Sequence, residues 1–348
     1  MTWLGPDLDP DHRDLLDMLD SFLADHDGEL LDDDERTAAL RAELAGLGIW
    51  TLGSAVEHGG GGADRLATTI AFERLGRRWP ALGLASVHAH AAVDVLGPSE
   101  HDLVRALHAG NAQVAVLDAE SEHARLTIDD DVVTGHIDRV DVTAVPAAVL
   151  LLGQPRVLLL ESAALHAGPL LRRTGLGGAR TTAIAVRGAL GSTVHALDDV
   201  DVDAARGRLR LGAAAVAAGI AGSAAAAAHA YAATRQQFGG PLTALPTVRG
   251  SLFGQTTRVS SLLAAILTTR IEDAVATAGV IDAASSAAVD VAAAALQVHG
   301  GYGYLAEYTA ERHVRDALSL QAATDAAGVA TLAARAMAEP STTDPVCQ

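Results

Sequence analysis

Arg235 and Phe238 close a long alanine-rich stretch, within residues 231–239 (Tyr-Ala-Ala-Thr-Arg-Gln-Gln-Phe-Gly). A guanidinium at a helix end presents a planar fork of N–H donors, which suits the oxygens of a phosphate or pyrophosphate. The same arginine also fits a solvated helix end, and Phe238 also fits an ordinary core position. Taken alone, these two residues leave both interpretations open.

Two adjacent glycines, Gly300 and Gly301, follow a second alanine-rich stretch and come shortly after Gln297. Without a Cβ atom, paired glycines let backbone N–H groups approach a phosphate or a sugar chain closely. A helix that ends at a glycine and then turns gives a similar pattern. The two glycines alone therefore leave both interpretations open. They belong to a longer pattern, Gln-x-x-Gly-Gly-x-Gly-Tyr, which is followed by Arg-Asp-Ala at 315–317.

Together, the two segments resemble the C-terminal domain of flavin-dependent acyl-CoA dehydrogenases. Residues 44–50, the glycine loop after them and residues 71–76 are similar to the family's N-terminal third. The resemblance implies that Arg235 contacts the FAD pyrophosphate and that Phe238 packs on the cofactor. It also implies that residues 297–301 form a second cofactor element supplied by a neighbouring subunit, so that the protein is an oligomer.

The resemblance also indicates where the catalytic base belongs, a carboxylate that removes the substrate α-proton beside the flavin. One family placement, the glutamate of a Glu-Gly-Thr triplet, falls on Thr324 of Thr324-Asp325-Ala326. The other placement, just before an arginine that matches Arg210, falls on Leu209. Neither Leu209 nor an unassisted threonine hydroxyl can accept this proton near neutral pH. We therefore predict no catalytic residue at either position.

Asp325 is a weak candidate for a relocated base. It lies one residue from the first placement, and one position on a helix or tight turn rotates a side chain by about 100°. Three functions remain open. They are a non-catalytic subunit that completes a partner's flavin site, a self-sufficient flavoenzyme with a relocated base in a biosynthetic pathway, and a flavin-free scaffold or repurposed non-redox fold.

Family elements that contact the flavin ring are altered as well. The β-domain loop Thr-Glu-Pro-Gly-x-Gly-Ser-Asp is shortened to residues 117–122, and residues 140–143 replace the Trp-Ile-Thr/Ser strand segment. The chain thus resembles the base-lacking subunit of actinobacterial heteromeric acyl-CoA dehydrogenases, heterotetramers that act in steroid side-chain degradation.

The resemblance to this subunit implies FAD shared with a homologous subunit that carries the catalytic glutamate. Such a hetero-oligomer binds the acyl-CoA thioester through the complex, in fatty acid or steroid metabolism. We expect the chain to be inactive alone. Within the complex it belongs to an oxidoreductase that acts on CH–CH groups with flavin as acceptor.

Hydrophobic patterning divides the chain into three regions. Apolar residues recur at helical spacing in an N-terminal helical domain, residues 1–112. Short apolar, β-branched runs predict a small central β-barrel domain, residues 113–203, with strands near 114–117, 132–133, 148–152, 157–160 and 182–186. Alanine-rich helices return in a C-terminal four-helix bundle with the flavin and oligomer contacts, residues 204–340, before a tail at 341–348. The predicted fold is mainly α with a central β-domain, the order found in acyl-CoA dehydrogenases.

Composition limits the possible partners and location. The 348 residues carry a formal net charge of −18, which disfavours nucleic acids and anionic membrane surfaces. The apolar run at 211–228 is rich in alanine and glycine, which predicts a buried helix rather than a membrane span. The single Cys347 allows no disulfide within the chain, and the histidines lack metal-ligand spacing. No secretion signal is visible at the N-terminus, so we expect a cytoplasmic location.

Overall fold

The N-terminal region of the computed structural model, which describes residues 2–26, 28–154 and 156–338, is helical. Its main elements are α1 (Pro10–Asp25), α2 (Asp34–Gly46), α3 (Arg65–Arg78), α4 (Pro80–Leu96) and α5 (His101–His108). The aspartates Asp9, Asp33 and Asp64 each accept a backbone N–H at the start of α1, α2 and α3, respectively. This capping satisfies donors that a helix N-terminus leaves unpaired. Local sequence therefore sets where these helices begin.

Two four-stranded sheets make up the central region of the described chain. One has the order β1 (Val114–Asp118), β4 (Ala148–Leu152), β5 (Val157–Glu161), β8 (Val194–Leu197). The other has the order β2 (Ala124–Asp129), β3 (Val132–Val142), β7 (Arg180–Ala189), β6 (Leu165–Leu170). Strands β1 and β4 pair in parallel, whereas β3 pairs antiparallel with β2 and β7. Buried apolar side chains of both sheets, including Ile137, Leu151 and Ile184, form one core between them.

The C-terminal region is a helical bundle built around one long central helix, α6 (Val202–Thr234). After it come the hairpin of β9 (Gln236–Gln237) and β10 (Gly240–Pro241), then α7 (Pro246–Thr268), α8 (Ala274–His299), α9 (Ala310–Ala323) and α10 (Ala326–Ala338). Glycines allow α6 to pack closely on α3. A Cβ at Gly219 would lie only 2.2 Å from the carbonyl oxygen of Glu73.

Two helices of this bundle are long and apolar enough to cross a membrane. In α6, 83% of the apolar window is buried inside the protein, and in Ala274–Tyr304 the figure is 39%. The core helices of a soluble bundle pass the same test of length and composition, so the observation is weak evidence for a membrane span. The predicted burial of residues 211–228 agrees with the position of α6.

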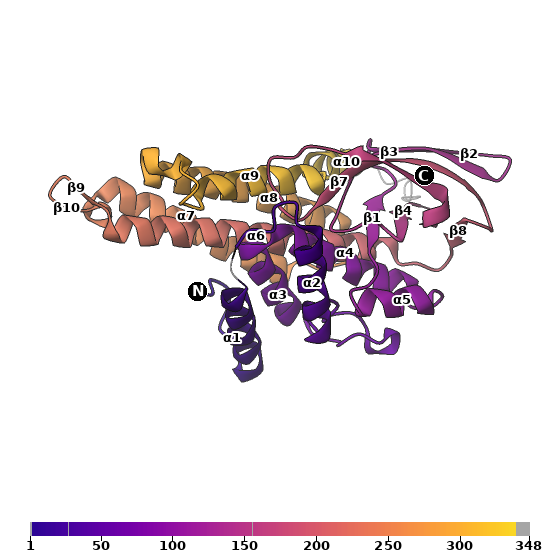
Figure 1. Ribbon diagram of the computed structural model, residues 1–348, viewed down its shortest axis with the longest axis horizontal. Helices are drawn as coiled ribbons and strands as arrows, with labels where there is room; N and C mark the ends of the chain where they lie inside the picture. Colours follow the sequence, from indigo (N-terminus) through magenta and orange to yellow (C-terminus); the bar gives the residue numbers. More distant parts are fainter. Residues whose placement is uncertain (1, 27, 155, 339–348) are drawn as a thin grey trace, which may run out of the picture.

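Figure 1 shows the bundle as an elongated body, with the β9–β10 hairpin at one end and the sheets at the other. The N-terminal helices pack on the side of α6. This arrangement confirms the predicted fold class of two helical regions around a central β region. The region boundaries fall between His108 and Val114 and between Leu197 and Val202. The predicted tail at 341–348, with Cys347, lies outside the described residues.

Candidate functional site

A cavity of about 90 Å³ lies where α4, α6, the sheets and the α9–α10 turn meet. Most of its wall is apolar, with Leu84, Val116, Ile137, Ala213, Ile281 and Val329 among the lining residues. Pockets that hold drug-sized ligands usually measure about 300–1,000 Å³. The cavity is therefore small and suits a short apolar group.

The structure brings both predicted base positions to this one cavity, although they lie far apart in sequence. Leu209 lines it from the first turns of α6, and Thr324 lines it from the end of α9. The Thr324 hydroxyl donates a hydrogen bond to the carbonyl of Leu320 at 3.0 Å, so its proton is used within the last turn of α9. Neither side chain can take a proton from a carbon acid.

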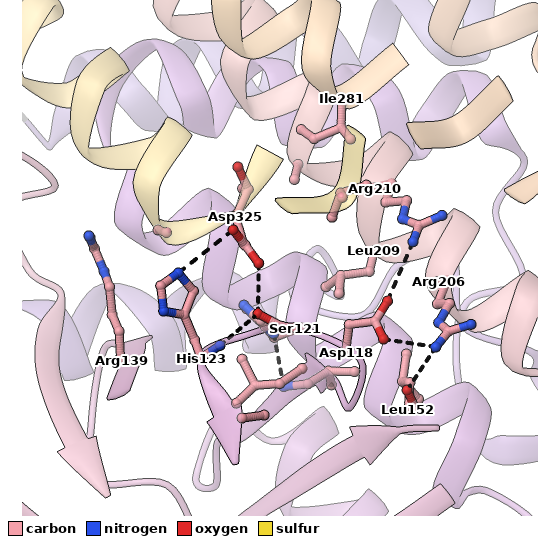
Figure 2. Close-up of a pocket in the computed structure, with 18 of the residues that line it drawn as sticks. Asp118, Ser121, His123, Arg139, Leu152, Arg206, Leu209, Arg210, Ile281 and Asp325 are labelled. Carbon is pink, nitrogen blue, oxygen red and sulfur yellow. Dashed lines mark hydrogen bonds and ion pairs between the residues drawn. The ribbon is translucent and has the colours of Figure 1, made fainter. Parts of the chain in front are cut away.

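Asp325 also lines the cavity, contrary to the rotation expected for a neighbouring helical position. The reason is its backbone: φ is +47°, so the chain turns sharply between α9 and α10 instead of continuing as a helix. The Ser121 hydroxyl donates to Asp325 Oδ2 at 2.7 Å, and His123 Nε2 lies 3.7 Å from Asp325 Oδ1. Figure 2 shows Asp325 directed toward these two residues. Both of its oxygens therefore face side chains of the shortened β1–β2 loop.

Asp118, at the end of β1, lies between two arginines that are one helical turn apart on α6 (Figure 2). Its Oδ1 accepts from Arg206 at 2.8 Å, and its Oδ2 accepts from Arg210 at 3.4 Å. The three side chains are only 9–14% exposed. Burial lowers the pKa of Arg210, whereas for Arg206 the effect of burial is outweighed by Asp118 and Glu120, which raise its pKa. The carboxylate thus compensates two desolvated guanidiniums.

The predicted cofactor residues lie at the other end of the bundle. Arg235 follows the last turn of α6, and its guanidinium carbon lies 4.8 Å from the ring centroid of Tyr302. Tyr302 belongs to the short 3-10 turn Gly300–Tyr304 that also holds the two predicted glycines. Sequence-distant segments thus meet at one site, and a cation–π contact fixes the guanidinium beside the glycine turn.

The surface around Arg235 is open and aromatic. Phe238 is 87% exposed and Tyr304 is 74% exposed, which is unusual for side chains of this size. Gly300 has φ +58°, a conformation that favours glycine, and no atom lies within 4 Å of a Cβ built on Gly300 or Gly301. Gln297 is exposed on the last turn of α8. These residues offer donors, a guanidinium and aromatic faces to a group that comes from outside.

The two ends of α6 differ in how well they fit a flavin dinucleotide. The bundle end fits its diphosphate side, because it has a half-buried guanidinium beside Tyr302 and a glycine turn with open space around it. The cavity does not fit the flavin ring system, because it is small and two of its arginines, Arg206 and Arg210, are already paired with Asp118.

Sequence reasoning identified Leu209, Thr324 and Asp325 but missed the partners that surround them. Asp118 and Arg206 are separated by 88 residues, and Ser121 and Asp325 by 204. The apolar strand ending in Asp118 gave no sign that its last residue pairs with arginines. The one available signal was the i, i+4 spacing of Arg206 and Arg210, which places them on one helix face.

Comparison with known families gives matches at both helical regions. Residues 9–97 match the acyl-CoA dehydrogenase N-terminal domain, and residues 203–328 match the acyl-CoA dehydrogenase C-terminal domain. The chain belongs to the acyl-CoA dehydrogenase family. Together the two matches cover more than half of the sequence.

Human mitochondrial short-chain specific acyl-CoA dehydrogenase is a sequence relative. It is 37% identical to this chain over 93 residues, which cover 25% of this chain and 23% of the human protein. The match thus spans about a quarter of the length of either protein, and it supports the family rather than a particular substrate.

Solved structures with the same fold cover nearly the whole chain. Butyryl-CoA dehydrogenase from Megasphaera elsdenii has a TM-score of 0.76 at 20% identity and covers 96% of this chain and 100% of its own. Glutaryl-CoA dehydrogenase from Mycobacterium smegmatis has a TM-score of 0.79 at 17% identity, with 97% of each chain covered. The prolyl acyl carrier protein oxidase AnaB has a TM-score of 0.80 at 15% identity and covers 96% of this chain and 100% of its own. At such identities the likeness shows the fold, which several activities share.

Proposed function

We propose that this acyl-CoA dehydrogenase-like chain is the non-catalytic subunit of a heteromeric flavoenzyme that carries out α,β-dehydrogenation of acyl-CoA thioesters. The observation that carries the proposal is the pair Leu209 and Thr324, which face one cavity where the family requires a carboxylate. A homologous subunit supplies the missing glutamate. When FAD is bound in the complex, it supplies the hydride acceptor.

The other acidic residues of the cavity support this assignment. Asp118 is held by two guanidiniums, and Asp325 accepts a hydrogen bond from Ser121. A general base needs a free lone pair within hydrogen-bond reach of the proton that it removes. Asp118 cannot provide it without leaving Arg206 and Arg210 uncompensated.

The role of this chain toward FAD is to hold the diphosphate side through Arg235, Phe238, Gln297 and the Gly300–Gly301 pair. At about 1.5 Å per helical residue, α6 places Arg235 roughly 37 Å from Arg210. A single flavin dinucleotide does not bridge that distance within one chain. The ring of a flavin held by Arg235 therefore lies in a second chain, so the cofactor is shared and the complex binds fewer flavins than it has chains.

A second candidate function is a self-sufficient flavoenzyme in which Asp325 is the relocated base. One observation favours it: Asp325 lines the same cavity as both family base positions. In that case Ser121 and His123 orient the carboxylate, and a remaining lone pair of Asp325 accepts the proton.

Expression of the chain alone and together with acyl-CoA dehydrogenase subunits from the same organism that carry the catalytic glutamate tests the proposal. We expect the isolated chain not to bleach flavin on anaerobic addition of acyl-CoA, and the complex to do so with less than one FAD per chain. If the isolated chain reduces its flavin and Asp325→Asn stops the reaction, the relocated-base function is correct. Asp290→Asn, on the exposed side of α8, is the matched control.

The proposed substrates are the acyl-CoA esters of lipid or steroid side-chain catabolism, and the proposed location is the cytoplasm. The resemblance to the base-lacking subunit of actinobacterial heteromeric acyl-CoA dehydrogenases supports this substrate class. Acyl-CoA turnover by the complex, compared between straight-chain and steroid side-chain esters, tests it.

A further inference from the structure

His88 is a buried histidine of α4 whose side chain lines the cavity and is used by none of the functions above. The backbone N–H of Val116 donates to its Nδ1 at 3.0 Å. Because Nδ1 accepts this hydrogen bond, a neutral ring carries its proton on Nε2. Throughout the described chain, no hydrogen-bond partner lies at that nitrogen. Because His88 lines the cavity, its ring adds one N–H donor with a fixed tautomer to a lining that also includes the paired arginines Arg206 and Arg210.

The charge state of His88 agrees with this geometry. Burial lowers its pKa to about 4, and the nearby Asp141 carboxylate offsets only part of the shift. The ring is neutral at physiological pH, so it offers a single donor and no positive charge. An unpaired N–H donor beside apolar walls gains free energy when an acceptor oxygen enters.

The route into the cavity defines which part of a ligand reaches His88. An outer cavity of about 240 Å³ shares Ser121, His123 and Asp325 with the inner one, whereas His88 lines only the inner one. The Ser121–Asp325 hydrogen bond of 2.7 Å lies between the two cavities, so a ligand that comes from the outer cavity has to part these residues before its leading end reaches the inner one. The acceptor that meets His88 is then on the far part of an acyl chain.

The charged residues of the outer cavity limit which carrier group, attached to the acyl chain, can approach the inner cavity. The outer cavity is lined by Glu120, Glu122 and Asp325 and, on the basic side, by Arg335 and His123. Glu120 also lies 3.3 Å from Arg206, so Glu122 and Asp325 carry most of the uncompensated negative charge. Acidic walls repel a polyanionic carrier. The inner cavity is small, with a volume of about 90 Å³. A short, uncharged acyl group fits both constraints.

We propose that His88 is a specificity-determining residue of this cavity, whose Nε2–H selects short uncharged acyl groups that carry an oxygen acceptor beyond the thioester carbonyl. Neither Leu209 nor Thr324 can deprotonate such a group, so its binding at His88 is measured apart from any turnover. The inference does not depend on FAD or on a partner chain, and its failure would leave the subunit assignment intact.

A matched pair of ligands tests the proposal on the full chain. S-acetoacetyl- and S-butyryl-N-acetylcysteamine differ by one keto oxygen on an uncharged carrier. We expect the acetoacetyl ester to bind about tenfold more tightly, as one added hydrogen bond gives. In ¹⁵N-histidine-labelled protein, only this ester should shift the Nε2–H resonance of His88.

Two variants separate the hydrogen bond from the shape of the ring. His88→Phe should remove the preference, and His88→Gln, which keeps a neutral N–H donor, should retain part of it. Because Phe leaves the Val116 N–H without its acceptor, the variant can fail to fold, and the resonance shift in the unmodified chain then decides alone. Equal affinities in the unmodified chain, no binding of either ester, the same shift with both, or a preference that survives in His88→Phe would overturn the proposal.

Discussion

The arginines at the two ends of α6 lie in opposite environments. At the C-terminal end, Arg235 lies on an open surface beside a glycine turn and exposed aromatic rings. At the N-terminal end, Arg206 and Arg210 are buried and paired with Asp118 of the same chain. One end presents groups for an external ligand, whereas the other satisfies its charges internally.

This difference shows that one long helix can carry a binding surface at one end and a cavity with internally paired charges at the other. The 33 residues of α6 span roughly 50 Å, so a change at one end has no direct contact with the other. A chain can thus keep the diphosphate side of a cofactor site while the ring side closes. The proposed division of labour between two subunits follows from that separation.

The largest expected effect concerns the missing base. In a complex with its partner, replacement of the partner's base glutamate by glutamine should lower turnover by about 10²–10⁴-fold. Asp325→Asn in this chain should change turnover less than twofold, because its cavity has no base at Leu209 or Thr324. Steady-state rates of the two variant complexes check the prediction. If Asp325→Asn lowered turnover by about 10²–10⁴-fold, Asp325 would be a catalytic residue. The proposed functional difference between the two ends of α6 would then be wrong.

The next effect concerns the stability of the closed end. Asp118→Ala leaves two buried guanidiniums without their carboxylate, which should lower the free energy of unfolding by about 3 kcal/mol. Asp290→Ala is the matched control, because it removes an exposed carboxylate from Arg258 and should cost less than about 1 kcal/mol. Urea unfolding of both variants measures the difference. Equal losses would mean that the cavity end is as solvated as the bundle surface.

Sequence patterns predicted the buried strands but not the exposed ones. The apolar runs at 114–117, 148–152 and 157–160 coincide with β1, β4 and β5, which are buried. The sequence predicted no strand at β2, β6 or β8, because exposed and polar positions interrupt the apolar pattern of these strands. Their existence depends on pairing with β3, β7 and β5, which is a tertiary property.

The sequence predicted those site residues whose positions could be counted from a recognisable motif. Counting from the two motifs reached Leu209 and Thr324, which meet in one cavity. The orientation of Asp325 was not predictable, because its positive φ depends on how α10 packs after the turn. The donor role of His88 was hidden as well, since a backbone N–H of a strand in another region sets its tautomer.

The open end leads to a smaller effect, on cofactor occupancy. Arg235→Ala should weaken FAD retention in the complex by about tenfold, as expected for loss of one charge-assisted hydrogen bond to phosphate. Arg258→Ala, on the exposed side of α7, controls for the loss of a surface charge. The ratio of flavin absorbance to protein absorbance after dialysis measures retention. Unchanged ratios in Arg235→Ala and also in Gly301→Val would show that the bundle end does not bind the cofactor.

The smallest effect tests whether the two ends unfold together. Burial lowers the pKa of His90, on α4, to about 4 and that of His313 in the bundle to about 3, with Arg312 adding to the second shift. Both rings are neutral when folded and take up a proton when unfolded below about pH 6.5. Stability is therefore full above pH 6.5 and falls as the pH drops toward 4, by about 1 kcal/mol for each ring at pH 5.5.

Replacement of either ring by glutamine should remove about 1 kcal/mol of the stability lost between pH 7.5 and 5.5. His229→Gln, at an exposed position of α6, gives the effect of the substitution itself. Tryptophan fluorescence reports the N-terminal region through Trp50 and Trp79, and circular dichroism at 222 nm reports all helices. If the chain is one cooperative unit, both probes give the same midpoint in every variant. If the midpoint measured by tryptophan fluorescence changed in His90→Gln but not in His313→Gln, the two ends of α6 would unfold separately. The two ends would then differ in stability as well as in function.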